Sequence, residues 1–195
     1  MPAPRLSAQV RQESPPLSDK VEAPISTVTP EKFRSVFRNH PGGVAVITAD
    51  AGQGPVGLTA TSVISVSVSP PLLVFSLSEL SSSTPTILEA ETVVVHLLGA
   101  DEIDVAKLCA TSGVDRFADT SIWRRMQTGE PHFTAARFWI RGKIVNRMSA
   151  GGSTLVAVEA LEIIAPDRDD PAQATRAPLV YHNQAWHALG EHSKV

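Results

Sequence analysis

Residues 57–75 read GLTATSVISVSVSPPLLVF, and this stretch decides the fold. Small hydroxyl residues alternate with Val and Ile at the period of a β-strand. A proline pair follows, and an unbroken apolar run comes after it. An exposed strand face could be built from Lys or Glu, so Ser and Thr predict a surface that is polar, uncharged and open to close approach.

The bulk composition predicts one globular domain. The chain has 195 residues, of which 43% are hydrophobic and 19% charged, enough for a single domain with a sizeable core. The formal net charge is -3 with acids and bases interspersed. This balance excludes the basic footprint that nucleic acid or an anionic membrane surface would require.

The sequence predicts a cytoplasmic protein. Its single cysteine, Cys109, rules out an intrachain disulfide and fits a reducing compartment. The N-terminal segment MPAPRLSAQVRQESPPL lacks the apolar stretch of a signal peptide. No segment approaches the ~20 apolar residues of a membrane span.

Three regions follow one another along the chain. Residues 1–29 are rich in Pro, Ser and Gln without helical or strand periodicity, which predicts a flexible or partner-bound tail. The folded domain is expected over 30–190, starting with a helix over 30–40 that has Thr29 as its N-cap and Pro30 at its first position. Residues 191–195 form a short C-terminal tail.

Strands outnumber helices in the predicted domain. Extended segments are expected at 44–49, from Val56 onward, and at 72–77, 92–98, 136–148, 153–164 and 177–189, with short helices at 85–91 and 101–110 and a loop-rich stretch at 111–134. Short turns or single short helices join most neighbours, which favours antiparallel pairing. The fold class is therefore mainly β, a β-barrel with peripheral helices.

Two glycine- and serine-rich motifs point to different conclusions. Residues 52–57, GQGPVG, match G-x-G-x-x-G formally, but Pro55 and a β-favouring segment follow instead of a helix, so a hairpin turn is favoured over a dinucleotide fingerprint. In LSSSTPTILEA, Pro85 at the first helical position makes Thr84 the N-cap, after Ser81, Ser82 and Ser83. Free N–H groups and hydroxyls converge there as an anion site requires, although ordinary capping is the alternative.

The remaining reactive side chains suggest no protein-based nucleophile. The six histidines form no HExxH or HxH pattern, and a metal site is not expected. His96 lies in an apolar strand and reads as a hydrogen-bonded core residue, while Cys109 reads as buried and inert. No G-x-S-x-G elbow is present. These features favour chemistry carried by a cofactor.

Several segments together resemble the flavin reductase-like family, small FMN-binding split β-barrels. The similar segments cover about 31–189: HPGGVAVIT, GPVGLTATSVISVSVSPPLLVFSL, SSSTPTILEA, DRFADTSIW and PLVYHNQAWHAL. The resemblance implies an antiparallel FMN-binding split barrel, FMN or FAD as cofactor and a homodimer with sites near the subunit interface.

The resemblance also implies site residues. Residues of the hydroxyl stretch would contact the flavin ring and ribityl chain, those before the second helix would hold the phosphate, and two residues of the Asp-Arg-Phe loop would close over the site. In that order these are Thr59, Ala60, Thr61 and Ser62; Ser82, Ser83 and Thr84; and Arg116 and Phe117.

Two positions depart from the family pattern. The family often carries Gly-Asp-His in the hairpin before its penultimate strand, where this chain has Gly151, Gly152 and Ser153. Ser153 is then the residue available to hydrogen-bond the nicotinamide carboxamide. The second departure is Gly42, where Thr is common in the family.

The expected function is an NAD(P)H-dependent flavin reductase. Hydride would pass from the nicotinamide of NADH or NADPH to flavin N5, and reduced flavin would be supplied to a monooxygenase component. Two alternatives remain open from the sequence. One is a non-catalytic flavin carrier, suggested by the missing Asp-His pair. The other is a split-barrel oxidase with another ligand, such as haem or a pyridoxal-type phosphate.

Overall fold

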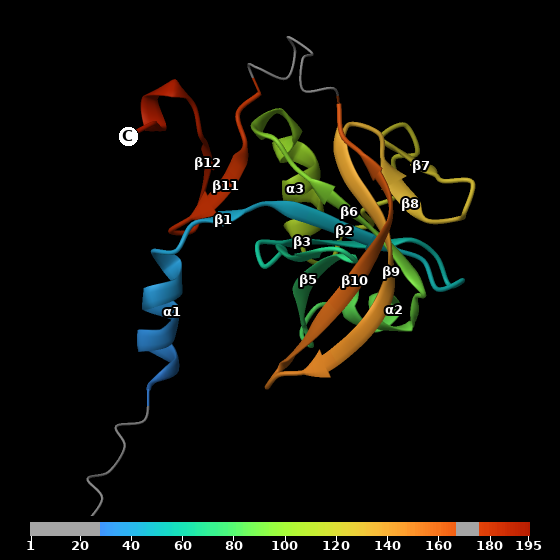
Figure 1. The fold of residues 1–195 in the computed structure, drawn as a ribbon, viewed down its shortest axis with the longest axis horizontal. Helices are drawn as coiled ribbons and strands as arrows, with labels where there is room; N and C mark the ends of the chain where they lie inside the picture. Colours follow the sequence, from blue (N-terminus) through green and yellow to red (C-terminus); the bar gives the residue numbers. More distant parts are fainter. Residues whose placement is uncertain (1–27, 167–175) are drawn as a thin grey trace, which may run out of the picture.

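The computed structural model describes residues 28–166 and 176–195 (Figure 1). Antiparallel strands make up most of these residues, and helices lie around them. This confirms the predicted mainly β fold with peripheral helices. The predicted tail at 1–29 lies almost wholly outside the described residues. Within the described ranges, no helix is both long and apolar enough to cross a membrane.

The first element is helix α1 (Pro30–Arg38), which begins where the sequence predicts. The Lys32 N–H donates to Thr29 Oγ1 at 3.3 Å, so Thr29 caps the helix and Pro30 occupies its first turn. The helix ends before Pro41-Gly42-Gly43. None of its residues is buried, and it stands apart from the barrel beside β1 and β11 (Figure 1).

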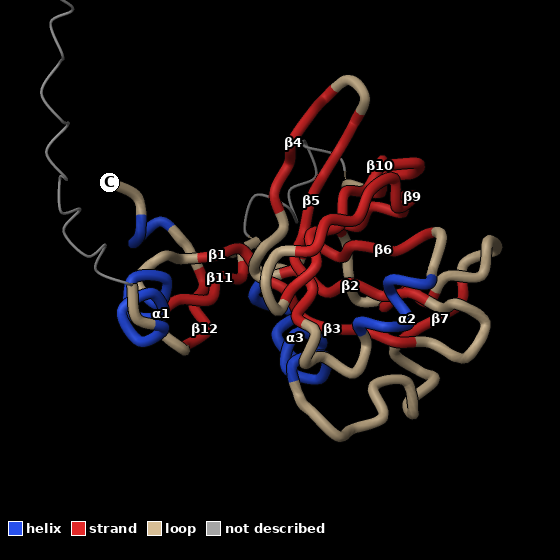
Figure 2. Tube along the Cα trace, turned by 90° about the horizontal axis from the view of Figure 1, so that it is seen from below, coloured by secondary structure: helices blue, strands red, loops and turns tan. Residues whose placement is uncertain are grey.

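The main sheet has seven strands, and every neighbouring pair is antiparallel. In spatial order they are β3 (Val56–Ala60), β2 (Ala45–Ala49), β6 (Thr92–Leu97), β9 (Phe138–Ser149), β10 (Ser153–Ile164), β5 (Pro71–Ser78) and β4 (Ile64–Val68). Hairpin β4–β5, with a cis peptide bond between Ser69 and Pro70 in its turn, projects from the rest of the sheet (Figure 2).

The two edge strands of this sheet are consecutive in the chain. Seven strands laid flat would separate β3 from β4 by about 29 Å, but the chain from Ala60 to Ile64 reaches at most about 14 Å. The sheet must therefore curl until its edges approach each other. At the meeting point the Ser76 N–H donates to Ser62 Oγ at 3.0 Å. A side chain thus joins the link after β3 to β5, where no ladder pairs β3 with β5, as a split barrel requires.

Long strands β9 and β10 bend together at a glycine. A Cβ at Gly142 would lie 2.3 Å from Val158 Cγ1 and 2.7 Å from Glu159 O. The register of the two strands shifts on either side of this position. Gly142 therefore permits the close backbone approach that lets the sheet curl.

Two small sheets lie where the sequence predicts a single strand and a loop. The segment 177–189, predicted as one strand, is a hairpin of β11 (Leu179–His182) and β12 (Ala185–Ala188), because Asn183 and Gln184 both adopt positive φ and turn the chain. β11 also pairs with β1 (Gly42–Gly43). The loop-rich stretch 111–134 contains a second unpredicted hairpin, β7 (Trp123–Arg125) with β8 (Pro131–Phe133).

Two further helices cover the barrel. Helix α2 (Thr84–Glu89) starts one residue earlier than predicted and has Ser83 as its N-cap. Helix α3 (Ile103–Ala110) follows a 3-10 turn, η1 (Ala100–Glu102), and packs against β3, where Thr59 Oγ1 donates to Ala106 O at 2.6 Å. A last 3-10 turn, η2 (Glu191–Ser193), lies in the segment expected to be a C-terminal tail.

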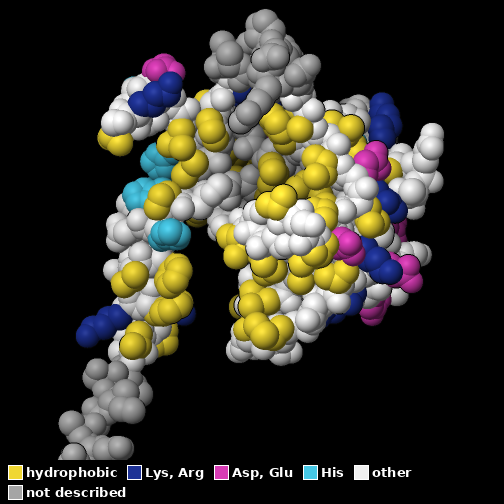
Figure 3. All heavy atoms as spheres, in the orientation of Figure 1, with side chains coloured by type: hydrophobic (Ala, Val, Ile, Leu, Met, Phe, Trp, Pro, Cys, Tyr) yellow, Lys and Arg dark blue, Asp and Glu magenta, His cyan; other side chains and the backbone are white. Residues whose placement is uncertain are grey.

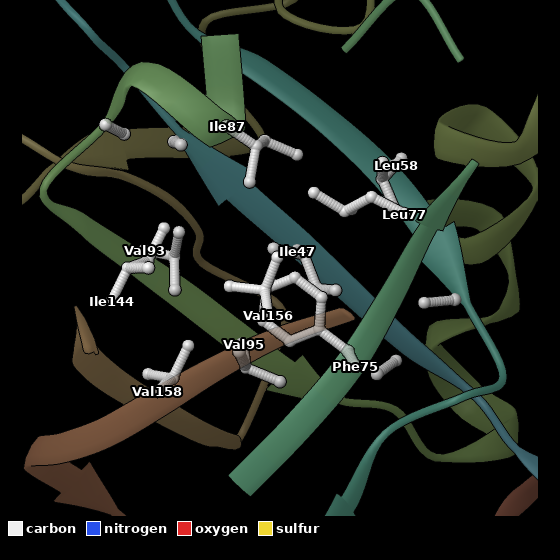
Figure 4. Packing of buried hydrophobic residues seen from close by; sticks show 14 of the residues in the cluster. Ile47, Leu58, Phe75, Leu77, Ile87, Val93, Val95, Ile144, Val156 and Val158 are labelled. Atoms are coloured by element: carbon white, nitrogen blue, oxygen red, sulfur yellow. The ribbon is translucent and has the colours of Figure 1, made fainter. Parts of the chain in front are cut away.

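Strand β2 is buried on both faces and separates two apolar clusters. Ile47 points into the barrel, where Phe75, Val95 and Val156 pack around it (Figure 4). Val46 points the other way, into a cluster built from α3, β8 and β11. Because strand side chains alternate between faces, the apolar run at 44–49 supplies both cores.

His96 links β2 to β8 as a neutral imidazole. Its Nδ1 lies 3.0 Å from Val46 O, and its Nε2 accepts the Phe133 N–H at 3.2 Å. These partners fix the proton on Nδ1. The side chain is fully buried, and this burial lowers the pKa of His96 to about 3. The predicted core role of His96 is confirmed.

This burial makes stability depend on pH. Below pH 6.5 the unfolded chain binds a proton at His96 that the folded chain refuses until about pH 3. We therefore expect the free energy of unfolding to fall by about 1.4 kcal/mol per pH unit from pH 6.5 downward. Urea unfolding between pH 7.5 and 5 measures the slope. A flat profile over that interval would contradict the assignment. His96→Asn is expected to reduce the slope and to leave the part that comes from His132, whose pKa burial also lowers.

Candidate functional site

A groove lined by hydroxyl side chains opens where the two sheet edges meet. It has a volume of about 280 Å³ and carries no charged side chain in its lining. Residues of β3 and the link after it form one wall, and residues of β5, the following loop and the start of β10 form the other. The lining residues are Leu58, Thr59, Ala60, Thr61, Ser62, Ser76, Ser78, Ser81 and Ser153.

The link at residues 61–63 supplies the most accessible polar groups. The β2–β3 ladder ends at Ala60 and the β4–β5 ladder begins at Ile64, so the backbone between them belongs to neither. Thr61 and Ser62 are exposed. Their backbone N–H and C=O groups and the Thr61 hydroxyl can therefore hydrogen-bond a bound molecule, while the Ser62 hydroxyl bonds to the Ser76 backbone. The prediction that Thr59 to Ser62 share one site is consistent with this placement.

The serines before α2 separate into two kinds. Ser81 lines the groove, and Ser82 is exposed beside it. Ser83 and Thr84 are buried, and their hydroxyls donate to Gly57 O at 2.9 Å and Ser78 O at 2.7 Å. The latter two side chains hold the loop against β3 and β5, which leaves Ser81 and Ser82 to face a ligand.

Arg116 and Phe117 lie outside the lining of the groove. The Arg116 guanidinium donates to Cys109 O and Thr111 O at the end of α3. Phe117 is buried and stacks on Phe133 in the outer core. Both residues stabilise the region around α3, and their predicted contact with a flavin stays a prediction.

Ser153 reaches the groove through the turn between β9 and β10. Gly152 O accepts the Glu79 N–H at 3.1 Å, which holds this turn against the loop after β5. The hydroxyl of Ser153 thus lies in the same groove as Thr61 and Ser62.

Sequence reasoning missed three groove residues. They are Leu58 on β3 and Ser76 and Ser78 at the end of β5. The signal was available, because Ser76 and Ser78 are two residues apart and so share one face of a strand.

Gly42 lies directly behind the link. A Cβ at this position would come within 3.0 Å of both Thr61 Cβ and Thr61 O. Glycine therefore lets β1 approach Thr61 closely. The family's more common Thr at this position would press on the link and alter the groove.

The other reactive side chains that the structure describes form no metal site. Within the described residues, no group of three His, Cys, Asp or Glu side chains is placed to hold a metal ion. Burial raises the pKa of the Cys109 thiol to about 12, so it is protonated at neutral pH. The chemistry of the hydroxyl groove itself fits a flavin, whose ring edge and ribityl chain need uncharged donors and acceptors.

Comparisons with known proteins agree with this fit. The family model described as flavin reductase like domain matches residues 37–190. An NADH:FMN oxidoreductase of Rhodococcus erythropolis is 38% identical over 188 residues, covering 88% of this chain and 96% of that protein.

Two further proteins are similar over most of their length. The reductase component of a 4-nitrophenol 4-monooxygenase/4-nitrocatechol 2-monooxygenase from Rhodococcus opacus is 28% identical, covering 86% of this chain and 83% of that protein. The crystal structure of a flavin reductase domain protein from Arthrobacter sp. FB24 superimposes with a TM-score of 0.73 at 33% identity, covering 82% of this chain and 95% of that one.

The two kinds of serine before α2 should respond differently to substitution. Ser82→Ala should raise the Kd for FMN several-fold with an unchanged free energy of unfolding, because Ser82 is exposed. Ser83→Ala should lower the free energy of unfolding by about 1–2 kcal/mol, since Gly57 O loses its buried donor. Flavin fluorescence titration and urea unfolding of both variants check this. An unchanged Kd in Ser82→Ala combined with Ser81→Ala would remove the phosphate site.

Proposed function

Because the chain belongs to the flavin reductase-like family, we propose that it is an NAD(P)H:flavin oxidoreductase that reduces FMN or FAD. The observation that carries this function is the uncharged, hydroxyl-lined groove at the split of the barrel. NADH is the favoured donor, since the relative from Rhodococcus erythropolis is named for NADH and FMN.

The flavin, when bound, supplies the chemistry, because its N5 accepts the hydride of the nicotinamide. The protein's own part is to bind and orient. The backbone of Thr61 and Ser62 and the Thr61 hydroxyl hydrogen-bond the ring edge and ribityl chain without a charge that would bias the ring's redox balance. Ser81 and Ser82 hold the phosphate, and Ser153 positions the nicotinamide carboxamide. Correct alignment of the two rings lowers the barrier by removing the entropy cost of their encounter.

The comparisons favour a reductase over the two alternatives left open by the sequence. The relative from Rhodococcus opacus is named as the reductase component of a monooxygenase. We extend this role to the present chain, with a flavin-dependent monooxygenase component as the partner that takes up reduced flavin in the cytoplasm.

The reductase activity has a direct test. Under anaerobic conditions, NADH added to the protein with stoichiometric FMN should bleach the flavin absorbance much faster than in a protein-free control. NADPH is added separately to rank the two donors. Flavin that binds but stays oxidised with both donors would contradict the proposal and favour a flavin carrier.

A homodimer completes the proposed function. Apolar side chains on β4 and β10 are unusually exposed: Val68 at 89%, Val66 at 56% and Ile163 at 56%. Val68 and Ile163 line an apolar groove of about 370 Å³, together with Leu97 and Ile140. Hydrophobic side chains also gather along α1 and over the neighbouring face of the domain (Figure 3). A patch of this kind is typical of a subunit interface, and a second copy of the chain is the proposed occupant.

Substitution within this patch should separate the subunits. The unmodified protein should run as a dimer in size-exclusion chromatography with light scattering at micromolar concentration. Val68→Asp with Ile163→Asp should give a folded monomer, because two carboxylates would be buried without partners. Val114→Asp, at an exposed loop position after α3, is the matched control. A monomeric unmodified protein would contradict the homodimer.

A further inference from the structure

A second groove continues from the hydroxyl groove. It has a volume of about 640 Å³ and shares Thr61 and Ser62 with the first. Its outer wall is formed by α1 and by the turn between β11 and β12. The hydroxyl groove, at about 280 Å³, is small for a ligand of flavin size. A larger ligand must therefore extend beyond it, and the second groove is the continuation at Thr61 and Ser62.

The second groove is positively charged. Its lining includes Arg34, Arg38, His40 and His182, and it includes no Asp or Glu. Arg34 lies 3.8 Å from Glu31 with both side chains well exposed, which is a weak pair. Among the described residues, no carboxylate lies within ion-pair distance of Arg38.

The helix dipole accounts for only one of these basic side chains. Arg38 stands in the last turn of α1, where a cation favours the helix dipole. Arg34 lies one turn earlier on the same face of the helix, and His182 comes from β11. Basic groups from two separate elements therefore converge on one space, as an anion site requires.

The two elements that carry these groups are tied together. The Asn183 N–H donates to Arg38 O at 2.9 Å. Asn183 and Gln184 have φ of 47° and 63°, a conformation that favours glycine at the second turn position. Gln184 stands there instead and adds an amide group to the lining of the groove. This hydrogen bond ties the end of α1, which carries Arg34 and Arg38, to the turn that follows His182.

We propose that this groove binds the pyrophosphate of a dinucleotide whose reactive ring lies at the hydroxyl groove. The inference rests on the proposed function and adds the residues that would recognise the dinucleotide. The Arg34 and Arg38 guanidiniums donate to phosphate oxygens, an interaction for which their planar fork is suited. The pyrophosphate belongs either to NADH or NADPH, or to FAD. FMN contains none.

The test begins with binding alone. Adenosine diphosphate ribose carries the pyrophosphate but neither flavin nor nicotinamide, so calorimetric titration reports the groove without catalysis. The variants are Arg34→Gln, Arg38→Gln and their combination. Lys32→Gln is the control, because Lys32 is on the same helix, carries the same charge and does not line the groove. The double variant should raise the Kd for the probe by about tenfold or more. The control should have the Kd of the unmodified protein.

Two further measurements identify the source of the pyrophosphate. If the pyrophosphate belongs to the donor, the double variant should have a KM for NADH about tenfold higher. Its KM for reduced nicotinamide mononucleotide and its Kd for FAD should be unchanged. If it belongs to FAD, the Kd for FAD should rise and the Kd for FMN should not. Arg38→Lys, which retains the charge, should recover part of the lost affinity.

Other outcomes would overturn the proposal. One is an unmodified protein that does not bind the probe. Another is a double variant that binds the probe, NADH and FAD with unchanged affinity. The third is a Lys32→Gln variant that loses as much affinity for the probe as the double variant. Failure of the proposed function is seen separately, as absence of flavin bleaching in the unmodified protein, while the probe titration still reports on the groove.

Discussion

The structure depends on a short covalent link between opposite edges of one sheet. β3 and β4 lie at the two ends of a seven-stranded order, yet only residues 61–63 separate them in the chain. The sheet has to curl because so few residues cannot span its flat width. Curling brings β5 to the link, and the Ser62 hydroxyl bonds to the Ser76 backbone at the seam. The barrel stays split there, and the split is the groove.

This constraint also explains why the groove is lined by hydroxyls. Backbone groups that leave a ladder need partners, and Ser or Thr can provide them without the desolvation cost of a charge. Ser62, Ser83 and Thr84 use their hydroxyls in this way within the fold. Thr61, Ser81 and Ser153 keep a similar surface open for a ligand. One residue type thus serves closure of the barrel and, in the proposed function, recognition of an uncharged ring.

Much of the architecture follows from local pattern in the sequence. The cap at Thr29, the burial of Cys109 and the core position of His96 are confirmed, because capping chemistry and apolar periodicity are properties of neighbouring residues. The strand predicted at 177–189 was wrong, since the turn at Asn183-Gln184 uses left-handed residues other than glycine. The hairpin β7–β8 was missed because its strands are only three residues long and pair across a polar loop.

The sequence by itself determined the strand-rich composition, the hydroxyl stretch and a family resemblance that covers most of the domain. Only the tertiary structure decided which hydroxyls are available to a ligand. Ser82 and Ser83 are neighbours of one chemical type, yet one is exposed and the other is buried on Gly57 O. The tertiary structure also decided that Arg34, Arg38 and His182 share a groove. Burial and convergence depend on segments far apart in the chain, and local pattern does not encode those distances.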